Sequence, residues 1–280
     1  MTFCDLTDEV TVTEQSGFSE AGQAFSFTCD GPYAAEIDPS DNLCLRAAEK
    51  LAESLGPRNG AHIHLQKNIP VAAGLGGGSA DAAATLRALM MFWERSIPEE
   101  DLSALALSLG AEVPVCLAQR PMWVRGIGDI LEPCVLPALP LVLVNPHKTC
   151  LTKEVFQAFD KTGSDRDKNG ISPKRHPEAT PKDLEPFSGL KTAEDLLAFL
   201  CRDTSNQLTV PAVGLVPEIS DVLNALTEQK ACHLVRMSGS GASCFGVCAT
   251  SLAAEEVARR LKQDHPEWLI LATRSYAGAV

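Results

Sequence analysis

Two spacings of apolar residues alternate along the first half of the chain. Single alternation of apolar and polar residues in Val10–Thr13 and Phe25–Phe27 predicts antiparallel strands within residues 3–27. A further strand is predicted at Ala61–Lys67, with Ile63 and Leu65 facing a core. Apolar residues recur at helical spacing in three segments, which we expect to be helices: Asp41–Leu55, Ser79–Phe92 and Pro98–Leu109.

The second half repeats these patterns and ends in a compact run of elements. Strands are predicted at Met122–Val124 and within Leu131–Val144, of which Leu141–Val144 is apolar throughout and expected to be central. A polar stretch at 160–186 predicts a long surface loop. The remaining elements alternate helices and strands, an order that indicates an α+β fold with helices on one face of an antiparallel sheet: Leu196–Cys201, Ile219–Leu226, His233–Met237, Cys244–Val247, Leu252–Leu261 and Trp268–Thr273.

The most unusual stretch is Pro70–Leu89, in which four of the five positions 74–78 are glycine. Ser79 and an alanine-rich run with high helix propensity follow directly. A glycine loop that leads into a helix N-terminus offers unpaired N–H donors and the positive end of the helix dipole, which is a phosphate-binding arrangement. Ser79 is expected to cap the helix or to face a metal ion. The alternative is a glycine-rich turn before an ordinary packed helix.

Two other phosphate-binding motifs do not fit this stretch. A Walker A loop requires Lys and then Ser or Thr after its last glycine, whereas Ser79 and Ala80 follow Gly78. A dinucleotide fingerprint requires a glycine where Ser79 stands, and a strand that runs directly into the loop, which Pro70 interrupts. A dinucleotide-dependent oxidoreductase is therefore a distant alternative.

Composition narrows the class of partner. The 280 residues suffice for two domains or one large one, and 45% of them are hydrophobic. A net charge of −12 argues against nucleic acid and anionic membranes as partners. There is neither an apolar run of membrane-spanning length nor a charged-then-apolar leader, so we expect a cytoplasmic protein. The ten cysteines form no C-x-x-C motif and are expected to be reduced.

Several motifs together resemble those of the GHMP kinase superfamily. The stretch PVAAGLGGGSADAA is similar to its P-x-x-x-G-L-G-G-G-S motif, and other segments agree in the same order: Asp41–Leu43, Leu109–Leu117, Gly126–Gly128, Asn145–Pro146 and Arg236–Phe245. The resemblance covers nearly the whole chain. It implies a two-domain α+β fold. Residues 1–140 would form an incomplete ribosomal-protein-S5-like, ATP-binding domain, and residues 141–280 a ferredoxin-like domain.

The resemblance also implies an activity and a set of site residues. The chain would use ATP and Mg²⁺ to phosphorylate the 2-hydroxyl of a cytidine diphosphate-linked methylerythritol, as a monomer or weak homodimer. Glu112 stands where the family has an aspartate that faces the substrate hydroxyl; as an alternative it is a surface acid. Ser79 would also face the metal. The nucleotide-binding positions would be Pro70, Val71, Ala72, Ala73, Gly74, Leu75, Gly76, Gly77, Gly78, Ser79, Ala80, Asn42 and Lys67.

One expected part of the family pattern does not occur in these residues. Family members begin with an A-K-[IL]-N-L strand, whose lysine helps to activate the transfer, and a hairpin with Gly-Tyr-His that holds the cytidine end. Neither motif occurs here, and neither Lys67 nor Lys148 is a convincing replacement. We therefore expect the 280-residue chain to be a fragment or to have a misplaced start, and to bind ATP weakly with little turnover. Two alternatives stay open: another GHMP-type small-molecule kinase, and a nucleotide-binding protein without catalysis.

Overall fold

The computed structural model describes residues 1–15, 25–56, 59–168, 190 and 192–277. The chain divides into two compact units, of which the first contains Met1–Val71 and Gly76–Cys134. The second contains Ala72–Leu75 and Val135–Val280, so the glycine stretch contributes to both units. Helices and sheets are mixed in each, which confirms the α+β class. The expected domain boundary at residue 140 falls inside the second unit, where strand β6 (Pro140–Asn145) begins.

The first unit has a three-stranded sheet in the order β1-β3-β2. The central β3 (Ala61–Gln66) is antiparallel to β1 (Glu9–Glu14) and parallel to β2 (Phe25–Asp30). The strands predicted within residues 3–27 both form and run in opposite directions, as expected, but they do not pair with each other because β3 lies between them. Every second residue of β3 is buried, whereas β1 and β2 keep exposed positions. The strand with the most continuous buried face thus takes the centre.

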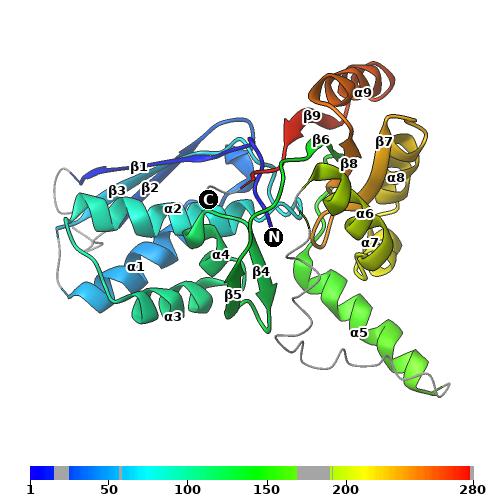
Figure 1. The fold of residues 1–280 in the computed structure, drawn as a ribbon. Helices are drawn as coiled ribbons and strands as arrows, with labels where there is room; N and C mark the ends of the chain where they lie inside the picture. Colours follow the sequence, from blue (N-terminus) through cyan, green and yellow to red (C-terminus); the bar gives the residue numbers. More distant parts are fainter. Residues whose placement is uncertain (16–24, 57–58, 169–189, 191, 278–280) are drawn as a thin grey trace. The chain divides into compact units, whose positions relative to one another are not determined.

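Helices cover one face of this sheet (Figure 1). They are α1 (Leu43–Leu55), α2 (Gly77–Phe92), α3 (Glu99–Leu109) and α4 (Val113–Ala118), with a short 3₁₀ helix, η1, at Ala34–Glu36. The helix α4 was not predicted, since six residues are too few to show a helical period. A hairpin of β4 (Met122–Arg125) and β5 (Ile130–Pro133) completes the unit. The core joins the sheet to the helices through Ala47, Leu51, Ile63, Leu65, Leu86 and Leu89.

The second unit has a four-stranded antiparallel sheet in the order β7-β8-β6-β9. Its strands are β6 (Pro140–Asn145), β7 (Cys232–Met237), β8 (Cys244–Cys248) and β9 (Leu269–Arg274). The strand β6 lies between β8 and β9, so the predicted central position is confirmed. The predicted strand region 131–144 is two strands, β5 and β6, in different sheets. Pro137 stands between them and has no N–H for a ladder.

The helices of the second unit lie on both faces of its sheet, which corrects the prediction of a single covered face. Helices α8 (Glu218–Thr227) and α9 (Ser251–Asp264) pack on the face that carries Val142 and Val144. Leu196 of α6 (Ala193–Asp203) packs instead with Leu234 and Val247. Alternate side chains of a strand point to opposite faces, so these clusters lie on opposite sides.

Two further helices, α5 (Thr152–Lys168) and α7 (Thr209–Leu215), belong to the same unit. The predicted surface loop at 160–186 is therefore wrong in its first part, because α5 continues through residue 168. The polar composition of that part is compatible with a helix that has a solvent-facing side. The rest of the predicted loop lies outside the described residues.

A glycine-rich hairpin turn holds the first part of the glycine stretch. Strands β7 and β8 pair as a hairpin, and Ser238–Gly241 lie in the turn between them. The hydroxyl of Ser238 donates to the carbonyl of Gly74 at 2.9 Å, and the N–H of Ser243 donates to the carbonyl of Ala73 at 3.1 Å. The hydroxyls of Ser240 and Thr152 lie 2.9 Å apart. Both serine hydroxyls of the turn are thus engaged within the protein.

This contact gives a prediction about Gly74. Its φ is +70°, and a Cβ atom there would lie 2.5 Å from the carbonyl oxygen of Ser238. Gly56 has a similar φ of +78° but nothing within 4 Å of its Cβ position. We expect Gly56→Ala to cost about 1 kcal/mol of unfolding free energy from backbone strain, and Gly74→Ala to cost clearly more. Denaturant unfolding of both variants measures the difference; equal losses would show that the backbone contact is unimportant.

Candidate phosphate-binding and transfer site

The N-terminus of α2 has the geometry that phosphate binding requires. Gly76 caps the helix in the left-handed conformation, with φ of 69°, and Gly77 is the first helical residue. The first N–H groups of a helix have no intrahelical acceptor, and they point out of its positive end. Gly78 is exposed, and Ser79 is half-buried as the third residue of the helix. The prediction that Ser79 caps the helix is therefore wrong, since Gly76 takes that position.

The two glycines that begin α2 serve different purposes. A Cβ atom on Gly77 would lie 3.1 Å from the Ile69 side chain and 3.1 Å from the Lys67 ammonium, so the absence of a side chain there allows internal packing. A Cβ atom on Gly78 would meet only a Leu43 methyl carbon at 3.5 Å, an ordinary contact. The backbone at Gly78 is therefore the part of the helix start that is open to solvent.

Glu112 lies against this helix start within the same unit. It precedes α4, and one of its carboxylate oxygens is 3.2 Å from the Cβ position of Gly76. A close backbone contact holds the residue before it: a Cβ atom on Gly128 would lie 2.1 Å from the carbonyl oxygen of Ala111. Burial raises the pKa of the Glu112 carboxyl above its ordinary value. The structure thus brings the candidate acid–base group to the candidate phosphate-binding loop.

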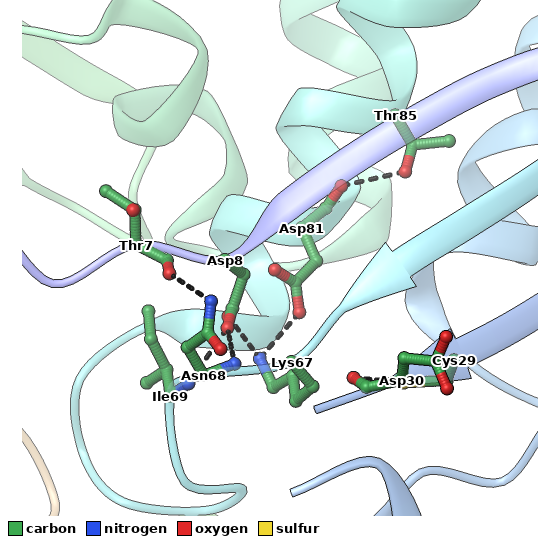
Figure 2. A network of polar contacts seen from close by, with 9 residues as sticks. All are labelled: Thr7, Asp8, Cys29, Asp30, Lys67, Asn68, Ile69, Asp81 and Thr85. Atoms are coloured by element: carbon green, nitrogen blue, oxygen red, sulfur yellow. Dashed lines mark hydrogen bonds and ion pairs between the residues drawn. The ribbon is translucent and has the colours of Figure 1, made fainter. Parts of the chain in front are cut away.

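Lys67 does not present its ammonium to solvent. The Nζ atom donates to Asp8 at 2.5 Å and to Asp81 at 2.7 Å, and the three side chains are only 2–5% exposed (Figure 2). Burial lowers the Lys67 pKa, but the two carboxylates outweigh it and leave that pKa raised. For Asp81 the effect of burial is the larger one. It raises the pKa of this carboxyl above its usual range, although the neighbouring Lys67 ammonium acts to lower it. The expectation that the Lys67 side chain contacts phosphate does not fit this geometry.

The backbone of Lys67 is also engaged. Its N–H donates to the Asp30 carbonyl at 2.7 Å, and its carbonyl accepts from the N–H of Tyr33 at 3.4 Å. The role of this backbone in lining a nucleotide pocket stays a prediction. Lys148, the other lysine considered, lies 3.2 Å from Glu218 at an exposed site in the second unit.

Asn42 has a structural role at the start of α1. Its side-chain oxygen accepts a hydrogen bond from the N–H of Leu45 at 3.0 Å, so Asn42 rather than Asp41 caps this helix. Asp41 instead forms an exposed ion pair with Arg46 at 2.8 Å. The cap accounts for Asn42 at the start of α1, and its role as a nucleotide-binding residue stays a prediction.

The remaining candidate residues divide between the units. Pro70 and Val71 belong to the first unit with Gly76–Ala80, and Ala72–Leu75 belong to the second. Ala72 has a φ of 51°, a left-handed conformation that is uncommon for alanine. Among the described residues, no group of three or more His, Cys, Asp or Glu side chains is placed to hold a metal ion. No described helix is long and apolar enough to cross a membrane.

Sequence reasoning missed the partners of Lys67. Asp8 precedes β1 in a segment without a clear pattern, and nothing local links it to a residue near position 67. Asp81 stands in the first turn of the helix predicted at Ser79–Phe92, where an acid is favourable to the helix dipole without a partner. The structure shows that it does need one, because Asp81, Thr85 and Leu89 follow one another at intervals of four and are all buried. An acid in such a stripe requires a buried partner.

Comparisons with known proteins show the family to which the chain belongs. The model of the GHMP kinase N-terminal domain matches residues 42–119, and that of the C-terminal domain matches residues 187–267. The chain belongs to the GHMP kinases. A protein of Rhizobium etli (strain CIAT 652) named 4-diphosphocytidyl-2-C-methyl-D-erythritol kinase is 41% identical over 100% of this chain and 86% of its own length. A protein of the same name from Paramagnetospirillum magneticum is 44% identical over 90% of this chain and 82% of its own length.

A solved structure supports the same assignment. The crystal structure of a 4-(cytidine 5'-diphospho)-2C-methyl-D-erythritol kinase is 31% identical, with a TM-score of 0.66 over 98% of this chain and 88% of that one. Within the GHMP kinases, the chain is therefore a member of the 4-diphosphocytidyl-2-C-methyl-D-erythritol kinase family. A homoserine kinase from Cytophaga hutchinsonii shares the fold, with a TM-score of 0.65 at 20% identity over 98% of this chain and 88% of that one.

The buried carboxyl of Glu112 gives a prediction about stability. A pKa raised by burial means that the folded state prefers the protonated form, so stability is lost as the pH rises through that pKa. We expect Glu112→Gln to raise the melting temperature at about pH 8 and to have little effect at about pH 4. Thermal unfolding of both proteins across this range measures the difference. A gain that does not change with pH would show that the Glu112 charge costs the fold nothing.

Proposed function

We propose that the chain transfers the γ-phosphoryl group of ATP to the 2-hydroxyl of 4-diphosphocytidyl-2-C-methyl-D-erythritol. The observation that carries the proposal is the position of Glu112, whose carboxylate lies 3.2 Å from the Cβ position of Gly76 at the start of α2. Phosphoryl transfer needs a phosphate cradle and a group that orients the attacking hydroxyl. Here the first unit of the chain supplies both, whereas the activating lysine of the family's A-K-[IL]-N-L motif does not occur in these residues, so we expect slow turnover.

The cradle is the start of α2. Its free N–H groups donate hydrogen bonds to the phosphate oxygens, and the positive end of the helix dipole favours the phosphate charge. These donors are fixed before the substrate arrives, so they need no reorganisation as charge develops in transfer. The open backbone at Gly78 lets phosphate approach closely, since no side chain stands in front of it.

Glu112 orients the acceptor alcohol. Its carboxylate accepts a hydrogen bond from the hydroxyl and receives the proton as the oxygen attacks phosphorus. The raised pKa of Glu112 brings its basicity closer to neutrality, which suits a general base. The family aspartate is one methylene shorter, and transfer by positioning is sensitive to such a change in reach.

Mg²⁺ accompanies ATP in this proposal. Magnesium in phosphate sites is held by a few protein oxygens together with the phosphates. Ser79, the third residue of α2, is the hydroxyl that would face it. The ion would neutralise phosphate charge.

The cradle is tested by Gly78→Ala with Gly214→Ala as its control. Each added methyl group finds room in the free protein, so both variants should fold. We expect Gly78→Ala to weaken ATP binding about tenfold, or ~1.4 kcal/mol, and Gly214→Ala to leave it unchanged. Titration calorimetry with ATP and Mg²⁺ gives both constants. Unchanged affinity in folded Gly78→Ala would remove this backbone from the binding site.

The role of Glu112 is tested by turnover. Glu112→Gln should bind ATP nearly as well as the wild type and phosphorylate the alcohol roughly 10²–10⁴ times more slowly, because a positioned acid–base group is lost. Glu112→Asp should retain or raise activity, since it restores the family residue. Phosphorylated product measured by chromatography reports the rate. Wild-type rates in Glu112→Gln would refute the assignment, and ATP binding without any product in the wild type would favour the non-catalytic alternative.

We further propose a cytoplasmic location and a monomer or weak homodimer. Both rest on the sequence alone. They agree with relatives that are named as kinases of a small metabolite.

A further inference from the structure

We propose that Asp8 and Asp81 are positioning residues that act through Lys67 to hold the start of α2 in place for the triphosphate of ATP. The inference rests on the proposed function and deepens it. Neither carboxylate touches the exposed backbone at Gly78. Their effect would pass through the ammonium beneath Gly77 and through the backbone that leads from β3 toward the loop.

The three charged side chains come from three separate segments of the first unit. Asp8 precedes β1, Lys67 directly follows β3, and Asp81 lies in the second turn of α2 (Figure 2). The ammonium bridges both carboxylates, at 2.5 Å and 2.7 Å. The contact therefore ties α2 to the sheet at the end of the helix that begins with the glycine loop.

Asp8 also fixes the backbone beyond β3. Its second carboxylate oxygen accepts from the N–H of Asn68 at 2.6 Å and from the N–H of Ile69 at 2.8 Å. The Asn68 side chain donates to the carbonyl of Thr7 at 3.1 Å, which closes a second link between the same segments. The residues just before Pro70 are thereby held by one carboxylate.

The ammonium lies directly under the first residue of α2. The Cβ position of Gly77 is 3.1 Å from Nζ of Lys67. A displacement of the ammonium would therefore change the packing against Gly77 directly. Hydrogen bonds within α2 begin at this turn, where the N–H of Ala80 donates to the carbonyl of Gly76 at 2.9 Å. A change in the ion cluster should therefore alter the first turn of α2 before it alters the rest of the unit.

Charge and position predict opposite results, which makes the inference testable. The cluster has two carboxylates and one ammonium, so its carboxylates act against a bound anion. If Asp81 mattered only through its charge, removing that charge would strengthen ATP binding. If it positions the helix start, removing its contact with Lys67 would weaken binding.

The first experiment compares Asp81→Leu with Asp81→Asn by calorimetric titration with ATP and Mg²⁺. Both remove the charge, but only asparagine keeps an oxygen that accepts from Lys67. We expect a Kd about tenfold higher for Asp81→Leu and a Kd near the wild-type value for Asp81→Asn. Leu51→Ala serves as a control that destabilises the core without touching the cluster, and its Kd should stay within about twofold.

Asp8→Asn provides an independent variant should Asp81→Leu not fold. Its amide still has an oxygen for the Asn68 and Ile69 N–H groups but no second acceptor for Lys67, so we again expect about tenfold weaker binding. Hydrogen–deuterium exchange of backbone amides gives a second measurement that needs no ligand. Peptides that cover residues 76–82 should exchange faster in Asp8→Asn and Asp81→Leu than in Leu51→Ala. The comparison is made between variants whose melting temperatures are lowered by the same amount.

The outcomes separate the two proposals. The positioning role is overturned if Asp81→Leu or Asp8→Asn folds and binds ATP as tightly as the wild type or more tightly. It is also overturned if the exchange rates of residues 76–82 depend only on the melting temperature of each variant. In either case a wild type that binds ATP and forms product leaves the proposed kinase activity intact. A wild type that neither binds ATP nor forms product overturns the proposed function and the ATP-specific inference together.

Discussion

The buried ammonium of Lys67 is the constraint on which the first unit depends. An ammonium taken out of water is costly unless charged partners surround it, and loss of one partner of a buried pair typically costs about 3–5 kcal/mol. Asp8 and Asp81 provide these partners from two other segments. Gly77 above the ammonium leaves it room, since a side chain there would lie within 3.1 Å. The start of α2, the candidate phosphate site, is thus held by a buried ion cluster that lies directly beneath it.

The glycine stretch illustrates why a single motif should not be given a single explanation. Gly74 allows close contact with the turn of the second unit, and Gly76 takes a left-handed conformation that caps α2. Gly77 makes room for Lys67, and only Gly78 presents open backbone. Three of the four glycines therefore build the loop rather than bind through it. A substitution at any of them affects function by a different physical route.

The sequence predicted most of the described elements, because they leave local signals, and the glycine stretch marks the candidate site in the same way. The helical periods of α1 and α2, the apolar run of β6 and the glycine stretch are all short-range patterns. The position of β3 between β1 and β2 is not local, since it depends on which strand buries most of its face. The pairing of Asp8 with Lys67 joins residues 59 positions apart and has no pattern at all. The helix α4, with six residues, is too short to show a period.

The candidate site reconciles two opposing electrostatic demands. A net charge of −12 and three acidic side chains in the same unit, Asp8, Asp81 and Glu112, would repel a nucleoside triphosphate. Two of these acids are neutralised in part by Lys67, and burial favours the protonated form of the third. The attraction must then come from dipoles rather than from net charge, and the start of α2 supplies them at short range. A site of this kind would attract phosphate only when the backbone approaches it closely, and the exposed backbone of Gly78, which carries no side chain, allows that approach.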